Sequence, residues 1–236
     1  MKRVPVASQD CATCGVRDKS VVCDLEGAEF ETFRAIQQSL RYDTGQTVFY
    51  EGHPCLGLYL LCSGRVKLTR TSTGGQRQIV RILDGGELIE KHAFRDGAVH
   101  EVTCETLEPA HLCFIPREAY LGLLQRNSAL AIRLIELLSS ELGIRMDQRD
   151  LFAFRSGRQR LAGLLLELSA RFGRKAGKGT LIGIRLKREE MADMAGVAVE
   201  TAIRLLSAFR KEGLISIDRR SITLINQDRL ARIAKI

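Results

Sequence analysis

The chain has 236 residues and a formal net charge of +8, with 45% apolar and 27% charged residues. This composition is that of a globular protein of one or two domains and excludes wholesale disorder. No stretch reaches the roughly 18 apolar residues that a membrane-spanning helix needs. The N-terminus has no apolar signal-peptide core, so we expect a cytoplasmic protein without a membrane partner.

Charge is distributed unevenly along the chain. Residues 153–236 carry 18 basic and 8 acidic side chains, a net charge of +10, whereas residues 1–152 carry 18 basic and 20 acidic ones, a net charge of −2. A basic C-terminal third indicates a separate module for a polyanion, most simply nucleic acid. Lysine and arginine also cover solvated helix faces, so charge alone leaves this interpretation open.

The cysteines all fall in the first half of the chain, at positions 11, 14, 23, 55, 62, 104 and 113. An odd number of cysteines without a signal peptide argues against a disulfide framework. Cys62 and Cys104 lie in apolar, strand-like runs, which is typical of buried thiols. Cys11, Cys14 and Cys23 lie in a polar segment with no core to join, which favours metal ligation.

The elements of the first half change from helix to strands. Apolar residues at helical spacing predict a short helix over residues 26–40. From residue 45 to 116, glycines separate short β-forming runs such as Leu58–Leu61 and Gln78–Ile82, which predicts a small antiparallel sandwich or barrel. The segment Ser72–Gly75 is typical of a hairpin turn.

A long helical pattern follows, over Ser128–Phe154. Leucines recur every three or four residues without an intervening proline. Such a helix can pack on the sandwich, but a stripe this long favours a seam with the same helix of a second chain, so we expect a homodimer. The expected seam residues are Leu134, Leu138, Leu142 and Arg145, the last near the middle of the helix, where like charges from two chains meet.

The C-terminal part is predicted to hold a helix, a strand, a helix–turn–helix and a hairpin. Gly196 supplies the permissive backbone at the turn between the two short helices. This order of elements is typical of a winged helix–turn–helix that binds DNA. The expected ranges are 160–173, 180–186, 188–194, 199–211, 214–217 and 221–225.

The second of these short helices carries the candidate base-reading side chains. Glu200, Ile203 and Arg204 project from the face opposite the core, and Thr201 lies near the N-terminal rim. Arg204 can donate two hydrogen bonds to guanine, and Glu200 can accept one from cytosine. A simple surface pair at i,i+4 is the other interpretation. The cations placed for phosphate contacts are Arg188, Arg210, Arg219 and Arg220.

The whole chain resembles the CRP/FNR superfamily of bacterial transcription regulators. Val199–Leu206 is similar to the family's V-E-T-x-S-R-L-L recognition helix. The resemblance implies that Glu200 and Arg204 contact the bases of an inverted repeat related to TTGAT…ATCAA, with RNA polymerase as a further partner. Ile203 replaces the family's serine, which changes the contact available to the outer half-site bases.

The resemblance also implies an α+β chain of four parts. A cysteine-bearing arm precedes a double-stranded β-roll, which is a jelly roll like that of cyclic-nucleotide-binding domains. A dimerisation helix and a winged helix–turn–helix domain follow. The implied boundaries are 1–24, 25–127, 128–154 and 155–236.

The sensor half does not match the cyclic-nucleotide readers of the superfamily. Gly86-Glu87-Leu88 is similar to the turn that precedes their phosphate-binding segment. The following residues 96–103 lack the family's arginine, and Glu101 would repel a phosphate. We therefore expect no cyclic nucleotide as ligand.

The arm cysteines indicate a different cofactor. Cys11, Cys14 and Cys23 place three thiolates on a short segment, which suits three corners of an iron–sulfur cluster. Resemblance to the FNR-type oxygen sensors implies Cys113 as the fourth ligand and a [4Fe–4S] cluster. Zinc and a bare thiol switch remain alternatives. A haem is another, with candidate ligands His92, His100 and His111.

We therefore expect a homodimeric, sequence-specific DNA-binding regulator and not an enzyme. In this hypothesis the cluster promotes dimerisation, and oxygen or redox state controls it. Two alternatives remain: a regulator of the same type without a cluster, and an iron–sulfur electron-transfer protein. An enzyme finds little support because the sequence holds no Walker motif, nucleophile elbow or dinucleotide fingerprint.

Overall fold

The computed structural model describes residues 25–75, 77–89, 91–140, 155–177, 179–219 and 221–235, without the side chains of residues 91 and 92. The chain divides at residue 143 into two compact units, an N-terminal and a C-terminal one. The expected cysteine arm lies outside the described residues. So do residues 141–154 of the expected dimerisation helix, with Leu142 and Arg145.

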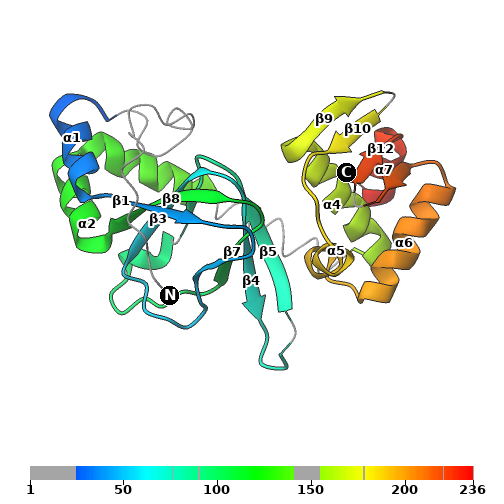
Figure 1. Cartoon of the computed structure of the whole chain (residues 1–236), viewed down its shortest axis with the longest axis horizontal. Helices are drawn as coiled ribbons and strands as arrows, with labels where there is room; N and C mark the ends of the chain where they lie inside the picture. Colours follow the sequence, from blue (N-terminus) through cyan, green and yellow to red (C-terminus); the bar gives the residue numbers. More distant parts are fainter. Residues whose placement is uncertain are drawn as a thin grey trace. The chain divides into compact units, whose positions relative to one another are not determined.

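The N-terminal unit contains two four-stranded antiparallel sheets (Figure 1). One has the order β1-β8-β3-β6 and the other the order β2-β7-β4-β5. Their strands are β1 (Gln38–Tyr42), β2 (Thr47–Phe49), β3 (Gly57–Ser63), β4 (Val66–Thr71), β5 (Arg77–Leu83), β6 (Leu88–Ile89), β7 (Thr103–Thr106) and β8 (Ala110–Pro116). The predicted β-roll is therefore confirmed.

Strand β3 shows how side-chain alternation builds two cores. Almost all of its side chains are buried, and successive ones point to opposite faces of the sheet. Leu60 and Cys62 belong to a core formed with the helices of this unit, which we call the helix-side core. Tyr59 and Leu61 belong to a second core, between the two sheets. Cys113 of β8 lies in the helix-side core.

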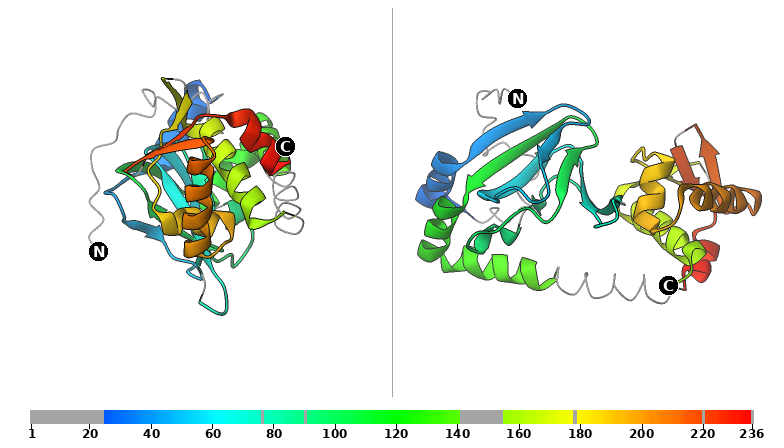
Figure 2. Two further views of the ribbon diagram at one scale, coloured as in Figure 1. Left: turned by 90° about the vertical axis from the view of Figure 1, so that its right-hand side faces the viewer. Right: turned by 90° about the horizontal axis from the view of Figure 1, so that it is seen from below.

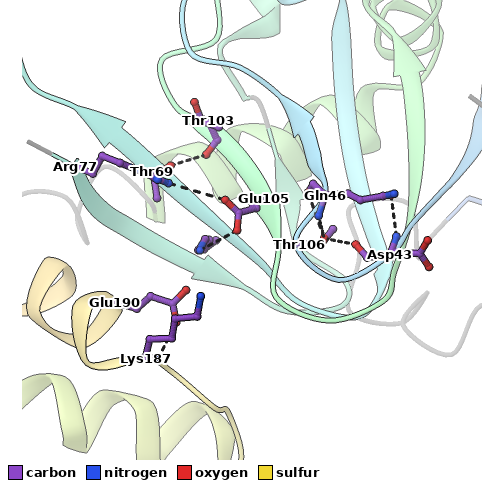
Figure 3. Close-up of polar contacts among 10 residues, drawn as sticks. Asp43, Gln46, Thr69, Arg77, Thr103, Glu105, Thr106, Lys187 and Glu190 are labelled. Atoms are coloured by element: carbon purple, nitrogen blue, oxygen red, sulfur yellow. Dashed lines mark hydrogen bonds and ion pairs between the residues drawn. The ribbon is translucent and has the colours of Figure 1, made fainter. Parts of the chain in front are cut away.

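The hairpin of β4 and β5 has the predicted turn. The N–H of Gly75 donates to the carbonyl of Ser72 at 2.9 Å, and Gly75 has the left-handed φ of +78° that favours glycine. Glu105 of the neighbouring strand β7 holds the hairpin through ion pairs with Lys67, at 3.0 Å, and Arg77, at 3.9 Å (Figure 3).

Helices cover one face of the β1-β8-β3-β6 sheet (Figure 2). They are α1 (Gly27–Ile36), α2 (Arg117–Arg126) and a helix over residues 128–140, and a short 3-10 helix spans Lys91–Phe94. The predicted helix over residues 26–40 is wrong at its C-terminal end. It stops at Ile36 because Gln38–Tyr42 pairs along its whole length with β8.

The 128–140 helix has two apolar faces. Leu130 and Leu134 are 4% and 5% exposed and lie in the helix-side core. Ile132, Ile135 and Leu138 are 57%, 61% and 36% exposed and form an outer stripe. Of the seam residues expected here, the structure places Leu134 in the core of its own unit and Leu138 on the outer stripe.

The C-terminal unit is a helical unit with one four-stranded sheet, in the order β11-β12-β10-β9. Its elements are α4 (Gly157–Phe172), β9 (Gly173–Ala176), β10 (Gly179–Ile182), α5 (Arg188–Ala195), α6 (Val199–Lys211), β11 (Ile215–Asp218), β12 (Ser221–Leu224) and α7 (Gln227–Ala234). The predicted helix–turn–helix and hairpin are confirmed. The predicted strand over residues 180–186 ends at Ile182, and β9 and α7 were not predicted.

Local capping explains where two of these helices begin. Ser156 caps α4 with its hydroxyl, which accepts from the N–H of Gln159, and the Gln159 side chain accepts from the N–H of Ser156 in return. Asn226 caps α7 by accepting from the N–H of Arg229 at 3.0 Å. Among the described residues, no helix is both long and apolar enough to cross a membrane.

Replacing an inner and an outer residue of the 128–140 helix separates its two faces. We expect Leu130→Ala to lower the free energy of unfolding by about 2–5 kcal/mol, because it leaves a cavity in the core. Ile135→Ala, on the exposed stripe, is expected to change it by less than about 0.5 kcal/mol. Urea unfolding followed by circular dichroism, at a concentration where sedimentation shows monomers, measures both. Equal losses would contradict the assignment of the faces.

Candidate DNA interface and candidate metal centre

The helix–turn–helix is built from α5, a three-residue turn and α6. The N–H of Lys187 donates to the Glu190 carboxylate at 2.8 Å, which fixes the start of α5 (Figure 3). Gly196 ends α5 with a φ of +60°, the left-handed conformation that the sequence predicted there. Helix α6 spans Val199–Lys211, in agreement with the prediction.

Helix α6 separates a buried face from an exposed one. Ala202, Leu206 and Phe209 are buried, as are Ala192 and the rest of the small core beneath the turn. The opposite face bears Glu200, Ile203 and Arg204, which are exposed, with Thr201 and Ser207 half-buried. The structure thus presents the predicted base-reading residues together on one accessible face.

The turn between the two helices is held from α4. Arg160 donates from Nε to the carbonyl of Ala195 and from Nη2 to that of Gly196, both at 2.8 Å. These bonds satisfy carbonyls at the end of α5 that have no partner within the helix. Gly157 lies so close to the turn that an added Cβ would come within 2.8 Å of Val197. The sequence analysis did not identify these contacts.

A second contact of α4 fixes the far end of α6. Arg158 donates from Nη2 to both carboxylate oxygens of Glu212 at 2.8 Å, and its guanidinium lies 4.9 Å from the ring centre of Phe209. Helix α4 thus contacts the helix–turn–helix at the turn and at the C-terminal end of α6. These two contacts fix the position of α6 within the C-terminal unit.

The arginines expected to contact phosphates lie on α5, on α6 and in the β11–β12 turn. Arg210 and Arg219 are exposed and Arg188 is half-buried, whereas Arg220 lies outside the described residues. Arg219 occupies the turn of the β11–β12 wing with a φ of +51°, in the left-handed region that is costly for a side-chain-bearing residue. Phosphate contacts by these arginines stay a prediction.

The other candidate site is a group of three soft ligands in the N-terminal unit. The Sγ atoms of Cys62 and Cys113 are 3.1 Å apart, and the ligand atoms of Cys62, His111 and Cys113 all lie within 4.8 Å of one another. All three residues are buried. The sequence singled out Cys113, but it treated Cys62 as a core thiol and His111 as a structural residue or haem ligand.

His111 is held in a neutral, hydrogen-bonded state. Its Nε2 lies 2.7 Å from the hydroxyl of Ser39 on β1. Burial, and then the charge of Arg41, lower the pKa of His111 below its usual value. A neutral imidazole is the form that ligates metals.

The segment that corresponds to a cyclic-nucleotide phosphate site is occupied by internal ion pairs. Arg95 pairs with Glu101 at 3.0 Å. Glu87 accepts from Arg81 and from the N–H of Asp84, both at 2.7 Å.

The arm cysteines Cys11, Cys14 and Cys23 lie outside the described residues. The first described residue after them, Leu25, is 2% exposed and belongs to the helix-side core together with Cys113. The first described residue of the N-terminal unit therefore lies in the same core as the thiol of Cys113.

Sequence comparison finds two domain families. Residues 39–127 match the cyclic nucleotide-binding domain, and residues 159–233 match the Crp-like helix-turn-helix domain. The cyclic AMP receptor protein of Thermus thermophilus is 34% identical over 174 residues, which are 74% of this chain and 77% of that protein. The fumarate and nitrate reduction regulatory protein of Escherichia coli K12 is 27% identical over 225 residues, 95% of this chain and 90% of that protein.

Structure comparison supports the same fold. The structure of FixK2 from Bradyrhizobium japonicum superposes with a TM-score of 0.73 at 22% identity, and the match covers 84% of this chain and 97% of that one.

Removing Arg160 tests the brace on the turn. We expect Arg160→Ala to lower the free energy of unfolding of the C-terminal unit by about 1–3 kcal/mol, because the carbonyls of Ala195 and Gly196 lose a charged donor. Arg160→Lys should recover only part of this, because an ammonium lacks the guanidinium fork. Arg174→Ala, an exposed arginine of β9, is the control. Thermal unfolding measures the stability of each variant. If Arg160→Ala is as stable as the control, Arg160 does not stabilise the turn.

Proposed function

Because the chain belongs to the CRP/FNR family of transcription regulators, we propose that it responds to oxygen or redox state through an N-terminal [4Fe–4S] cluster. As a member of this family it binds DNA, forms a dimer and is not an enzyme. One observation carries the proposal: Cys113 shares its core with the helix that bears the exposed apolar stripe. The proposed compartment is the cytoplasm, where bacterial DNA lies.

Of the four proposed cluster ligands, Cys113 is the one that the structure describes, and its thiol suits an iron–sulfur cluster. Cys113 supplies a buried thiol, and Leu25 ties the start of the folded chain to the same core. Cys23 stands two residues before Leu25 in the sequence. Cys11 and Cys14 are farther along a segment long enough to reach the same place. These four cysteines would hold the cluster.

A bound cluster supplies a redox-active group anchored by thiolates. The chain converts this ligation into the position of a helix. Ligation at Cys113 restrains β8, and the helix-side core passes that restraint to Leu130 and Leu134. The outer face of the same helix presents Ile132 and Ile135 to a second chain. In this proposal, ligation biases a two-state pairing equilibrium.

Pairing of two chains determines how DNA is read. Two α6 helices spaced by one DNA turn, roughly 34 Å, reach successive major grooves of an inverted repeat. We propose a site related to TTGAT…ATCAA, in which Arg204 reads guanine and Glu200 accepts from cytosine. Ile203, which is 50% exposed, is suited to a thymine methyl group. RNA polymerase is the proposed partner at the promoter.

Cyclic nucleotides are not the proposed effector, although the domain family takes its name from them. Glu101 adds negative charge to the segment where a phosphate would bind. The guanidinium of Arg95 forms an ion pair with Glu101. The ion pair would have to open before the guanidinium met another anion.

Anaerobic iron and sulfide analysis tests the cofactor. We expect the chain purified without air to contain [4Fe–4S] iron and sulfide with a broad visible absorbance, and to lose both, together with dimers in sedimentation, on exposure to air. Cys14→Ser and Cys113→Ser should lack the cluster, whereas the buried Cys104→Ser should keep it. A sharp Soret band, or a colourless chain with stoichiometric zinc, would contradict the proposal.

Operator binding separates base reading from phosphate binding. We expect Arg204→Ala to weaken operator binding by about 1–3 kcal/mol and to relax specificity at one base pair. Arg219→Ala should weaken binding to all sequences about equally and lower the salt slope by about one. Fluorescence anisotropy at several salt concentrations measures both. Equal effects of Arg204→Ala on operator and random DNA would place Arg204 on the phosphates.

A further inference from the structure

Cys62, His111 and Cys113 form a group of three possible metal ligands. The proposed [4Fe–4S] cluster would use only one of them, Cys113. Three side chains with ligand atoms within 4.8 Å of one another come from two adjacent strands and are buried. Cluster ligation uses Cys113 and leaves Cys62 and His111 without a role. Two sulfurs and an imidazole nitrogen are the donor set that zinc prefers.

A β-bulge lies at Cys62, on the face of β3 that also carries Leu60. Along the β3–β8 ladder Leu61 pairs with Leu112 and Ser63 pairs with His111, so Cys62 is an extra residue without a partner in the register. A bulge re-aims the side chain of the extra residue and is common beside functional sites. Here its Sγ lies 3.1 Å from that of Cys113.

A supporting contact orients the imidazole. The Ser39 hydroxyl binds Nε2 of His111 at 2.7 Å, which leaves Nδ1 for a metal. Ligating histidines commonly have their second ring nitrogen bonded in this way, which fixes the tautomer and the ring.

We propose that Cys62, His111 and Cys113 form a binding site for one thiophilic divalent cation, with Zn²⁺ as the occupant. Binding replaces the two thiol protons, which leave to solvent, so that two thiolates neutralise the charge of the cation. Three protein ligands leave a fourth tetrahedral position for water.

An open cleft beside His111 is the route to solvent that this proposal gives the site. It has a volume of about 400 Å³ and is lined by Arg41, Ser63 and His111, among others. Because His111 belongs both to the cleft lining and to the ligand group, the cation and its water enter from this side.

The site needs no cysteine of the arm. If the arm thiolates and Cys113 hold a cluster, as in the proposed function, the two occupants exclude each other because both use Cys113. The cation then occupies the chain that has lost its cluster. The cation site itself does not depend on the cluster.

Cobalt and zinc titration of a chain without arm thiols tests the site. The full-length variant Cys11→Ser/Cys14→Ser/Cys23→Ser is purified metal-free under reducing, anaerobic conditions. We expect one Co²⁺ per chain, with thiolate-to-metal charge-transfer and tetrahedral ligand-field bands that one equivalent of Zn²⁺ abolishes. Adding Cys62→Ala should weaken Zn²⁺ binding about 100-fold or more. Adding Ser39→Ala should weaken it about 10- to 100-fold and keep the cobalt bands.

Adding Cys104→Ala is the matched control, because it removes a buried thiol from the core between the sheets. It should bind cobalt and zinc like the parent. His111→Gln provides a second ligand variant, and circular dichroism reports whether each variant folds. Absence of thiolate–cobalt bands in the folded parent, or zinc affinity unchanged by both Cys62→Ala and His111→Gln, would overturn the site. If the [4Fe–4S] proposal is wrong, the expected cobalt and zinc results stay the same, because the tested variant has no arm cysteines.

Discussion

The packing of the 128–140 helix on the sheet that carries Cys113 is the interaction on which the proposed regulation depends. Helical periodicity places Leu130 and Leu134 one turn apart on the inner face, and Ile132 and Ile135 therefore point away from it. A close-packed core transmits displacement because its side chains have no free volume to absorb it. A change in the sheet thus reaches the outer stripe through one layer of side chains.

The C-terminal unit is built differently, for rigidity. Arg160 and Arg158 connect α4 to the two ends of the helix–turn–helix, and Gly157 allows the close approach. The shape of α6 is therefore set within one chain. What remains to be regulated is the spacing between two copies of it, which only dimerisation determines. In the proposed function, the N-terminal unit senses the signal and the C-terminal unit reads the DNA sequence.

Local signals predicted much of the fold. The helix–turn–helix was predicted from Gly196 and the amphipathic pattern of α6, and the sheets were predicted from short strands between glycines. Each of these signals lies within a short stretch of sequence. Strand β1 was missed because its half-exposed residues have no strong period, and pairing with β8 decides its conformation. Periodicity also does not tell which side of an amphipathic helix faces its own core, so Leu134 was expected in the seam. The nearness of Cys62 to Cys113 arises from the pairing of two strands that are far apart in the sequence, which no local pattern reports.

Hydrogen–deuterium exchange of the full chain with intact cluster, compared with the same chain after exposure to air, tests the coupling most directly. The account predicts that loss of the cluster raises exchange in β8 and in the 128–140 helix, while α5 and α6 keep their protection. Exchange that rises in the arm alone, with β8 and that helix unchanged, would contradict it.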